Sequence, residues 1–205
     1  MNHPEVGQAG ASVAAVVASM DGKLGQFAAY VTTCSSREEP VQNLQEATTA
    51  LLDAFSRRNN GATPRRIIVY RDGVSDNQFE TVLEREVTAY KEALMLRGFG
   101  PDDVQIAVVM CQKRHQTRLV YQADPSMDGT GDYVNPCVGL CVDGRSYAGK
   151  SVVESEYGCI NTPGLNEFYL NSHAAVLGTS KPCKYVLIYD EIGLKVKMPK
   201  YFFCL

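Results

Sequence analysis

One aspartate lies directly after a predicted strand, which is where open α/β sheets carry their binding and active sites. Asp72 follows directly after residues 66–71 (RIIVYR), an apolar run that predicts a short buried strand, and it precedes Gly73. In such sheets, ligands bind beyond the carboxyl ends of the strands, and a carboxylate there can hold a divalent cation. Position alone does not establish this role, because an aspartate before a glycine is also typical of a tight turn.

A short basic segment is a second candidate site. Residues 113–118 (KRHQTR) contain Lys113, Arg114 and Arg118, and cations at this density can contact successive phosphates of a nucleic acid. The competing interpretation is a solvated strand end, with His115 as polar lining. The net charge of −3 neither indicates nor excludes a nucleic-acid partner, because the footprint of a phosphate backbone is local.

A nucleotide-binding motif is the main alternative. Residues 144–151 (GRSYAGKS) match the phosphate-loop pattern GxxxxGK[ST], and residues 186–191 (VLIYDE) resemble the acidic strand that accompanies it. The chemistry requires the loop to open a helix whose N-terminus receives the phosphate. Residues 152–164 (VVESEYGCINTPG) do not predict a helix, which argues against nucleotide hydrolysis as the function. A helix over residues 151–160 would reverse that interpretation.

The cysteines and the hydropathy pattern restrict the cellular compartment. The chain has seven cysteines, an odd number, and none of them forms a CxxC pair; Cys137 and Cys141 are the nearest two. This pattern favours reduced thiols in a cytoplasmic or nuclear protein over disulfides or zinc. His173 is interpreted as a core histidine. No apolar run approaches the ~20 residues of a membrane helix, so we expect no membrane association.

The elements that must position these residues begin with a hairpin. Residues 12–19 and 26–33 predict two strands around an Asp21–Gly22 turn. A helical period follows and ends at residues 59–61 (NNG), a plausible C-cap. The apolar residues on this helix face are Val41, Leu44, Leu51, Leu52 and Phe55.

The next part of the chain predicts strand, helix and strand. Ser75 and Gln78 form a capping box before an apolar helical stripe that stops at Gly98. Further strands are predicted at residues 104–111, 117–122 and 184–190, and an exposed loop at 123–135. The expected architecture is α/β, with a mixed sheet that opens with the hairpin and continues with parallel crossovers. A flavodoxin-like fold would lack the opening hairpin.

Five segments of the chain resemble the Argonaute family, and more narrowly its Piwi domain. They occur in family order over residues 1–191. They are MNHP at the start, VAAVVASMD at 13–21, IIVYRDGVSDNQF at 67–79, QKRHQTRLV at 112–120, and FYLNSHAAVLGTSKPCKYVLIYDE at 168–191. The resemblance implies a ribonuclease H-like mixed sheet with flanking helices. It assigns residues 1–194 to a Piwi domain truncated at both ends and residues 195–205 to an atypical tail.

The resemblance also implies a two-metal nuclease site, of which only part is present. Asp72 matches the family's second catalytic aspartate, and Glu39 matches its inserted glutamate, although Glu39 also reads as an exposed acid near a helix start. The first aspartate would fall immediately before Met1. The fourth position would be Cys204, a poor ligand for Mg²⁺. Asp72 and Glu39 are thus expected to be vestigial, and Mg²⁺ or Mn²⁺ to bind only if the site is completed.

The function expected from the resemblance is binding of a guide small RNA in RNA silencing. Lys113, Arg114 and Arg118 would contact the guide backbone, and a complementary target RNA and other silencing proteins would be further partners. Cleavage of the target is not expected. The alternatives are an active guide-directed endoribonuclease if the missing parts are restored, and a non-functional fragment. The family's first strand would also precede Met1, beside residues 12–19 and 66–71, so we expect marginal stability.

Overall fold

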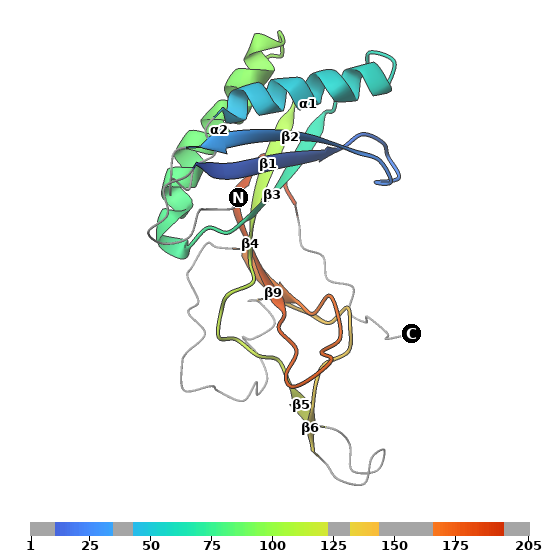
Figure 1. Ribbon diagram of the computed structural model, residues 1–205, viewed down its shortest axis with the longest axis vertical. Coiled ribbons are helices and arrows are strands. Elements are labelled where there is room, and N and C mark those ends of the chain that lie inside the picture. The colour runs from blue at the N-terminus through green and yellow to red at the C-terminus, as the bar shows by residue number, and fades with distance from the viewer. Residues whose placement is uncertain (1–10, 35–42, 123–131, 144–165, 195–205) are drawn as a thin grey trace. The chain divides into compact units, whose positions relative to one another are not determined.

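The computed structural model describes residues 11–34, 43–122, 132–143 and 166–194 (Figure 1). The chain divides into two compact units, Met1–Ala107 and Val108–Leu205, which are described separately. Within the described ranges, no helix has both the length and the apolar character needed to cross a membrane.

The first unit opens with the predicted hairpin. Strands β1 (Ser12–Ser19) and β2 (Phe27–Cys34) pair antiparallel in continuous register from Ser12↔Cys34 to Ser19↔Phe27. The predicted turn at Asp21–Gly22 lies in the loop between the two strands, where the Leu24 N–H donates to the Asp21 carbonyl at 3.3 Å. The Asp21 carboxylate accepts hydrogen bonds from the backbone N–H groups of Gly25 (2.9 Å) and Gln26 (3.2 Å), and so organises a longer loop.

Helix α1 (Leu44–Arg58) packs against both strands of the hairpin. Its predicted apolar face is confirmed in the residues that the structure describes, with Leu44, Ala47, Thr48, Leu51 and Leu52 buried. The predicted end is also confirmed. The Asn59 N–H donates to the Phe55 carbonyl at 3.0 Å, and Gly61 follows at a φ of +84°, which glycine adopts without strain.

Strand β3 (Arg66–Asp72) leads through a short 3₁₀ turn (Asp76–Gln78) into helix α2 (Phe79–Leu96), which packs on α1. The predicted capping box is confirmed, because Ser75 and Gln78 bond each other reciprocally. The helix ends where predicted, with Gly98 at a φ of +83°. The buried face of α2 is Val82, Glu86, Val87, Tyr90, Ala93 and Leu94.

Strand β4 (Gln105–Gln112) crosses the boundary between the units, and it is apolar and buried along most of its length. The other strands lie in the second unit. They are β5 (Tyr121–Gln122), β6 (Tyr133–Val134), β7 (Cys141–Asp143), β8 (Asn166–Leu170) and β9 (Cys183–Asp190). Strand β8 pairs antiparallel with both β7 and β9.

The described strands form three sheets. The largest is five-stranded, in the order β3-β4-β9-β8-β7, while β1-β2 and β5-β6 are two-stranded. The predicted strand at 184–190 is confirmed. The prediction at 117–122 was too long, since only Tyr121–Gln122 form a β-strand, and they pair with Tyr133–Val134 of the expected loop. The hairpin was expected in the main sheet, but among the described residues no strand joins β1 to β3.

Candidate nucleic-acid interface

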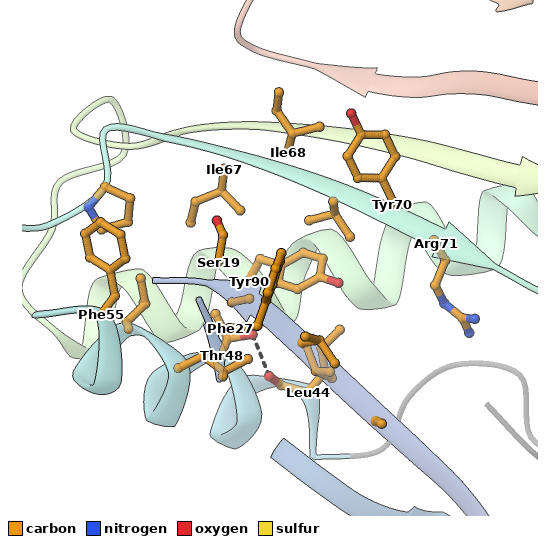
Figure 2. A pocket seen from close by; sticks show the side chains of 18 of the residues that line it. Ser19, Phe27, Leu44, Thr48, Phe55, Ile67, Ile68, Tyr70, Arg71 and Tyr90 are labelled. Atoms are coloured by element: carbon orange, nitrogen blue, oxygen red, sulfur yellow. Dashed lines mark hydrogen bonds between the residues drawn. The ribbon is translucent and has the colours of Figure 1, made fainter. Parts of the chain in front are cut away.

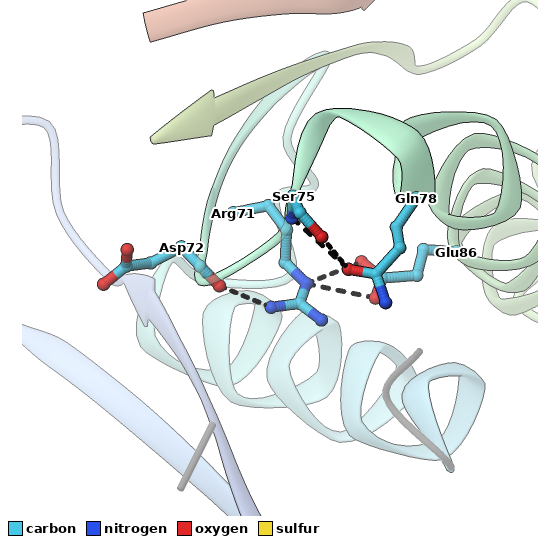
Figure 3. Close-up of polar contacts among 5 residues, drawn as sticks. All are labelled: Arg71, Asp72, Ser75, Gln78 and Glu86. Carbon is cyan, nitrogen blue, oxygen red and sulfur yellow. Dashed lines mark hydrogen bonds and ion pairs between the residues drawn. The ribbon is translucent and has the colours of Figure 1, made fainter. Parts of the chain in front are cut away.

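Asp72 lies at the carboxyl end of β3, as predicted. Its side chain is exposed, whereas the preceding residue, Arg71, is buried, because successive residues of a strand point to opposite faces. Figure 3 shows the Asp72 carboxylate directed away from the Arg71 guanidinium, which instead donates to the Asp72 backbone carbonyl at 2.6 Å. Gly73 follows at a φ of +86°, so the chain turns sharply away from the strand.

A buried ion pair holds this strand end on α2. Arg71 Nε donates to both carboxylate oxygens of Glu86, at 3.1 and 3.2 Å, and the two residues are 8% and 2% exposed (Figure 3). Burial, and then the negative charge of Glu86, raise the pKa of the neighbouring Tyr90 phenol. Sequence reasoning missed this pair. Its signal was a glutamate on the otherwise apolar stripe of the predicted helix.

The basic segment follows β4 in the second unit. Lys113, Arg114 and Arg118 are all exposed, and the Arg118 guanidinium donates to the carbonyls of His115 (3.0 Å) and Thr117 (2.8 Å). Exposure alternates along residues 114–120, with the odd-numbered side chains turned inward. The segment therefore presents its arginines to solvent while its other face is anchored.

The anchors come from β8 and from the residue before β9. His115 Nε2 bonds the Pro182 carbonyl at 2.8 Å, and its ring meets Tyr169 edge-on, with centroids 5.4 Å apart. Thr117 donates to the Tyr169 hydroxyl at 3.4 Å. His115, interpreted from the sequence as polar lining, is half-buried and bonds the Pro182 carbonyl. Tyr169 was not singled out from the sequence, because it lies far along the chain from the residues that it contacts.

Two asparagines fix the turn between β8 and β9. Asn135 donates to the Gly178 carbonyl at 2.7 Å and accepts from the Ser180 N–H at 2.9 Å. Asn171 is buried and donates to the Pro136 and Cys137 carbonyls. His173 lies in this turn and is exposed, so its interpretation as a core histidine was wrong. The turn is held by the asparagine side chains, and the His173 imidazole takes no part in these bonds.

The cysteine prediction requires one correction. Cys111, Cys141 and Cys183 carry free thiols, as expected, but Cys137 is disulfide-bonded. Cysteine spacing cannot reveal such a bond, because the two partners are brought together by the fold and not by the sequence.

Several candidate residues lie outside the described ranges. They are Glu39, Cys204 and the phosphate-loop motif at 144–151, together with residues 151–160, whose conformation was to decide between the alternatives. Across the described part of the chain, no three His, Cys, Asp or Glu side chains gather in a way that could hold a metal ion. The described residues do not provide a two-metal site, and the catalytic and metal roles of Asp72 stay predictions.

Comparison with known proteins decides the family. The family model described as "Piwi domain" matches residues 1–198. The chain belongs to the Piwi domain family. Argonaute 5 of Arabidopsis thaliana is 36% identical over 94% of the chain, and argonaute 2 of Oryza sativa subsp. japonica is 34% identical over 94%. The chain spans only 19% and 17% of the lengths of these two relatives.

Solved structures show the same fold. The C-terminal lobe of a budding yeast Argonaute matches 90% of this Piwi domain with a TM-score of 0.71 at 28% identity, over 36% of its own length. Kluyveromyces polysporus Argonaute with a guide RNA matches 90% with a TM-score of 0.70, also at 28% identity, over 21% of its length. The expected ribonuclease H-like α/β fold with a mixed sheet is therefore confirmed.

Proposed function

We propose that this Piwi domain binds the backbone of a guide small RNA through Lys113, Arg114 and Arg118. The observation that supports the proposal most directly is the anchored basic segment. Its inner side chains are fixed by Pro182 and Tyr169, and its cations are exposed. A strand-like segment with one face anchored holds its cations in position, which lowers the ordering cost of gripping a backbone. Similarity to an Argonaute crystallised with a guide RNA supports the nature of the ligand.

The proposal further holds that the chain does not itself cleave a target. A two-metal mechanism requires several oxygen ligands around a pair of ions ~4 Å apart. Asp72 is exposed at the end of β3, and Glu86, a buried carboxylate of the same unit, is engaged by Arg71. The exposure of Asp72 and the pairing of Glu86 with Arg71 support guide binding without cleavage. A slicer activity in a longer polypeptide remains the competing function.

The decisive experiment is the salt dependence of RNA binding. The full chain is titrated against a fluorescein-labelled single-stranded RNA of mixed sequence at several salt concentrations. Replacing Lys113, Arg114 and Arg118 with Ala should weaken binding for every sequence. The loss of three phosphate contacts should reduce the slope of log K against log[salt] by about 2.

The matched control removes the same charge elsewhere. Lys23, Arg57 and Arg65 are exposed cations of the first unit, and their combined replacement with Ala changes the net charge equally. The control variant should keep the wild-type affinity and slope. Equal effects of the two triple variants would show that net charge, and not the basic segment, governs binding, and the assignment would fail.

A further inference from the structure

A neutral amide lies in the middle of the basic segment. Gln116 stands between Arg114 and Arg118, and the side chains of all three are exposed. Exposure alternates here, so Gln116 shares the outer face of the segment with the two arginines, while its direct neighbours are turned inward. The proposed phosphate contacts use the cations alone. The exposed amide between them is therefore a further candidate for contact with the bound strand.

The two neighbours of Gln116 in the chain are the residues that anchor the segment. His115 Nε2 bonds the Pro182 carbonyl at 2.8 Å, and Thr117 donates to the Tyr169 hydroxyl at 3.4 Å. Because a carbonyl oxygen can only accept, the proton of the first bond lies on the imidazole. Anchors on both sides hold the backbone at Gln116, which restricts the directions in which its side chain can point.

The Arg118 guanidinium is held beside Gln116 as well. Its Nη1 atom donates to the carbonyls of His115 (3.0 Å) and Thr117 (2.8 Å), the residues on either side of Gln116. A guanidinium also has N–H donors on Nε and Nη2, and these can bind an anion. A phosphate bound by Arg118 would thus lie close to Gln116, within reach of its side chain.

The polar atoms of the amide determine what it can recognise. A glutamine side chain carries both a hydrogen-bond donor and an acceptor. A phosphate oxygen only accepts, and the arginines already match it. A ribose 2′-hydroxyl both donates and accepts, and in RNA it lies on the carbon next to the one that carries the 3′-phosphate. A phosphate on Arg118 therefore brings a 2′-hydroxyl to a place that Gln116 can reach.

We propose that Gln116 contacts a ribose 2′-hydroxyl of the bound strand, so that the basic segment distinguishes RNA from DNA. The inference rests on the proposed guide binding and adds to it a residue that senses the sugar. The cations cannot make this distinction, because the phosphates of RNA and DNA are alike. A neutral contact releases no counterion, so Gln116 contributes to affinity without contributing to the salt dependence.

The test compares RNA and DNA of the same sequence, built from A, C and G only, so that the two strands differ in the 2′-hydroxyl alone. The full chain is titrated against each fluorescein-labelled strand. Gln116→Met keeps the length of the side chain and removes the amide. This variant should bind RNA about two- to tenfold more weakly than the wild type and bind DNA unchanged. Its slope of log K against log[salt] should equal that of the wild type.

Two further variants are the controls. Gln105, at the start of β4, is another exposed glutamine, and Gln105→Met should leave both affinities unchanged. Thr48→Val removes a buried hydrogen bond of the first unit, in which the Thr48 hydroxyl donates to the Leu44 carbonyl at 2.7 Å (Figure 2). It tests whether a weakened fold alone lowers binding, and it should leave the ratio of RNA affinity to DNA affinity unchanged.

The other outcomes overturn the proposal. Equal losses for RNA and DNA in Gln116→Met would place the amide on a phosphate, and a loss that depends on the sequence would place it on a base. No loss for either strand would show that Gln116 makes no contact. The proposed function fails separately, when RNA binding is absent or is unchanged by replacement of Lys113, Arg114 and Arg118.

Discussion

The buried Arg71–Glu86 ion pair holds the end of the strand that carries Asp72. Arg71 precedes Asp72 on β3, and its guanidinium bonds both the Glu86 carboxylate on α2 and the carbonyl of Asp72. The backbone that carries the aspartate is thereby tied to the helix. A buried pair of this kind contributes little net stability, but removal of one partner leaves the other charge unpaired.

This asymmetry gives a testable prediction. Glu86→Ala should lower the free energy of unfolding by about 3–5 kcal/mol, because Arg71 would remain buried without its carboxylate. Chemical denaturation measures the change. Glu84→Ala is the control, since Glu84 lies on the exposed face of the same helix and should cost under about 1 kcal/mol. Similar losses of unfolding free energy in both variants would show that the pairing of Glu86 with Arg71 does not explain the effect of Glu86→Ala.

The buried phenol of Tyr90, beside Glu86, makes the stability of the fold depend on pH. Burial and the Glu86 charge raise the pKa of its phenol above the ordinary value of 10.0. The unfolded chain therefore loses this proton first, so the stability that the neutral phenol provides is complete below pH 10 and is lost as the pH rises further. One such group steepens the fall by about 1.4 kcal/mol per pH unit.

Tyr90→Phe should remove that component. Unfolding free energies measured between neutral pH and the alkaline limit should fall less steeply in this variant than in the wild type. Tyr70→Phe serves as the control for loss of a tyrosine hydroxyl at an exposed position, because Tyr70 is 67% exposed. An unaltered alkaline slope in Tyr90→Phe would contradict the link between burial and titration.

At the scale of elements, the sequence correctly predicted those features that depend on residues close together in the chain. The capping box at Ser75 and Gln78 and the helix end at residues 59–61 are confirmed, because both depend on residues a few positions apart. The hairpin around Asp21–Gly22 is also confirmed, and the Asp21 carboxylate accepts hydrogen bonds from backbone groups further along its loop. The short strands β7 and β8 were not predicted, because a run of three to five residues has little periodicity to read.

The candidate site likewise has a part that the sequence predicted and a part that it did not. The cations Lys113, Arg114 and Arg118 could be named from the sequence, since a basic cluster is a local pattern. Their support could not be named, because Tyr169 and Pro182 lie far away along the chain and become neighbours only in the fold. The Arg71–Glu86 pair escaped notice for the same reason, although a glutamate in an apolar stripe was visible.

The outer face of the hairpin leads to a prediction about solubility. Val13, Val17, Phe27 and Val31 are all more than two-fifths exposed there, with exposures of 43%, 58%, 60% and 64%. Each such side chain would contribute roughly 1.5–3 kcal/mol if buried. We therefore expect the purified chain to self-associate as its concentration rises, with light scattering as the measurement. A soluble monomer with a sharp, cooperative thermal transition would contradict this expectation.

At the scale of the whole molecule, binding and cleavage have different requirements. The proposed backbone binding uses the exposed cations of one anchored segment in the second unit. Cleavage by two metal ions needs ligands from several elements held together at one point. Among the described residues, Asp72 does not belong to any group of three or more such ligands. Binding of a guide and cleavage of a target can therefore be tested separately.

The last prediction follows from this difference. The full chain, incubated with a guide RNA, a complementary labelled target and Mg²⁺ or Mn²⁺, should leave the target intact while retaining the guide in a filter-binding assay. Asp72→Asn is the control for any cleavage that is observed. Cutting opposite the guide that disappears in Asp72→Asn would show that the chain assembles an active metal site, and the proposal of binding without cleavage would be wrong. Cutting that persists in Asp72→Asn would identify a contaminating ribonuclease, because it does not depend on the carboxylate at the end of β3.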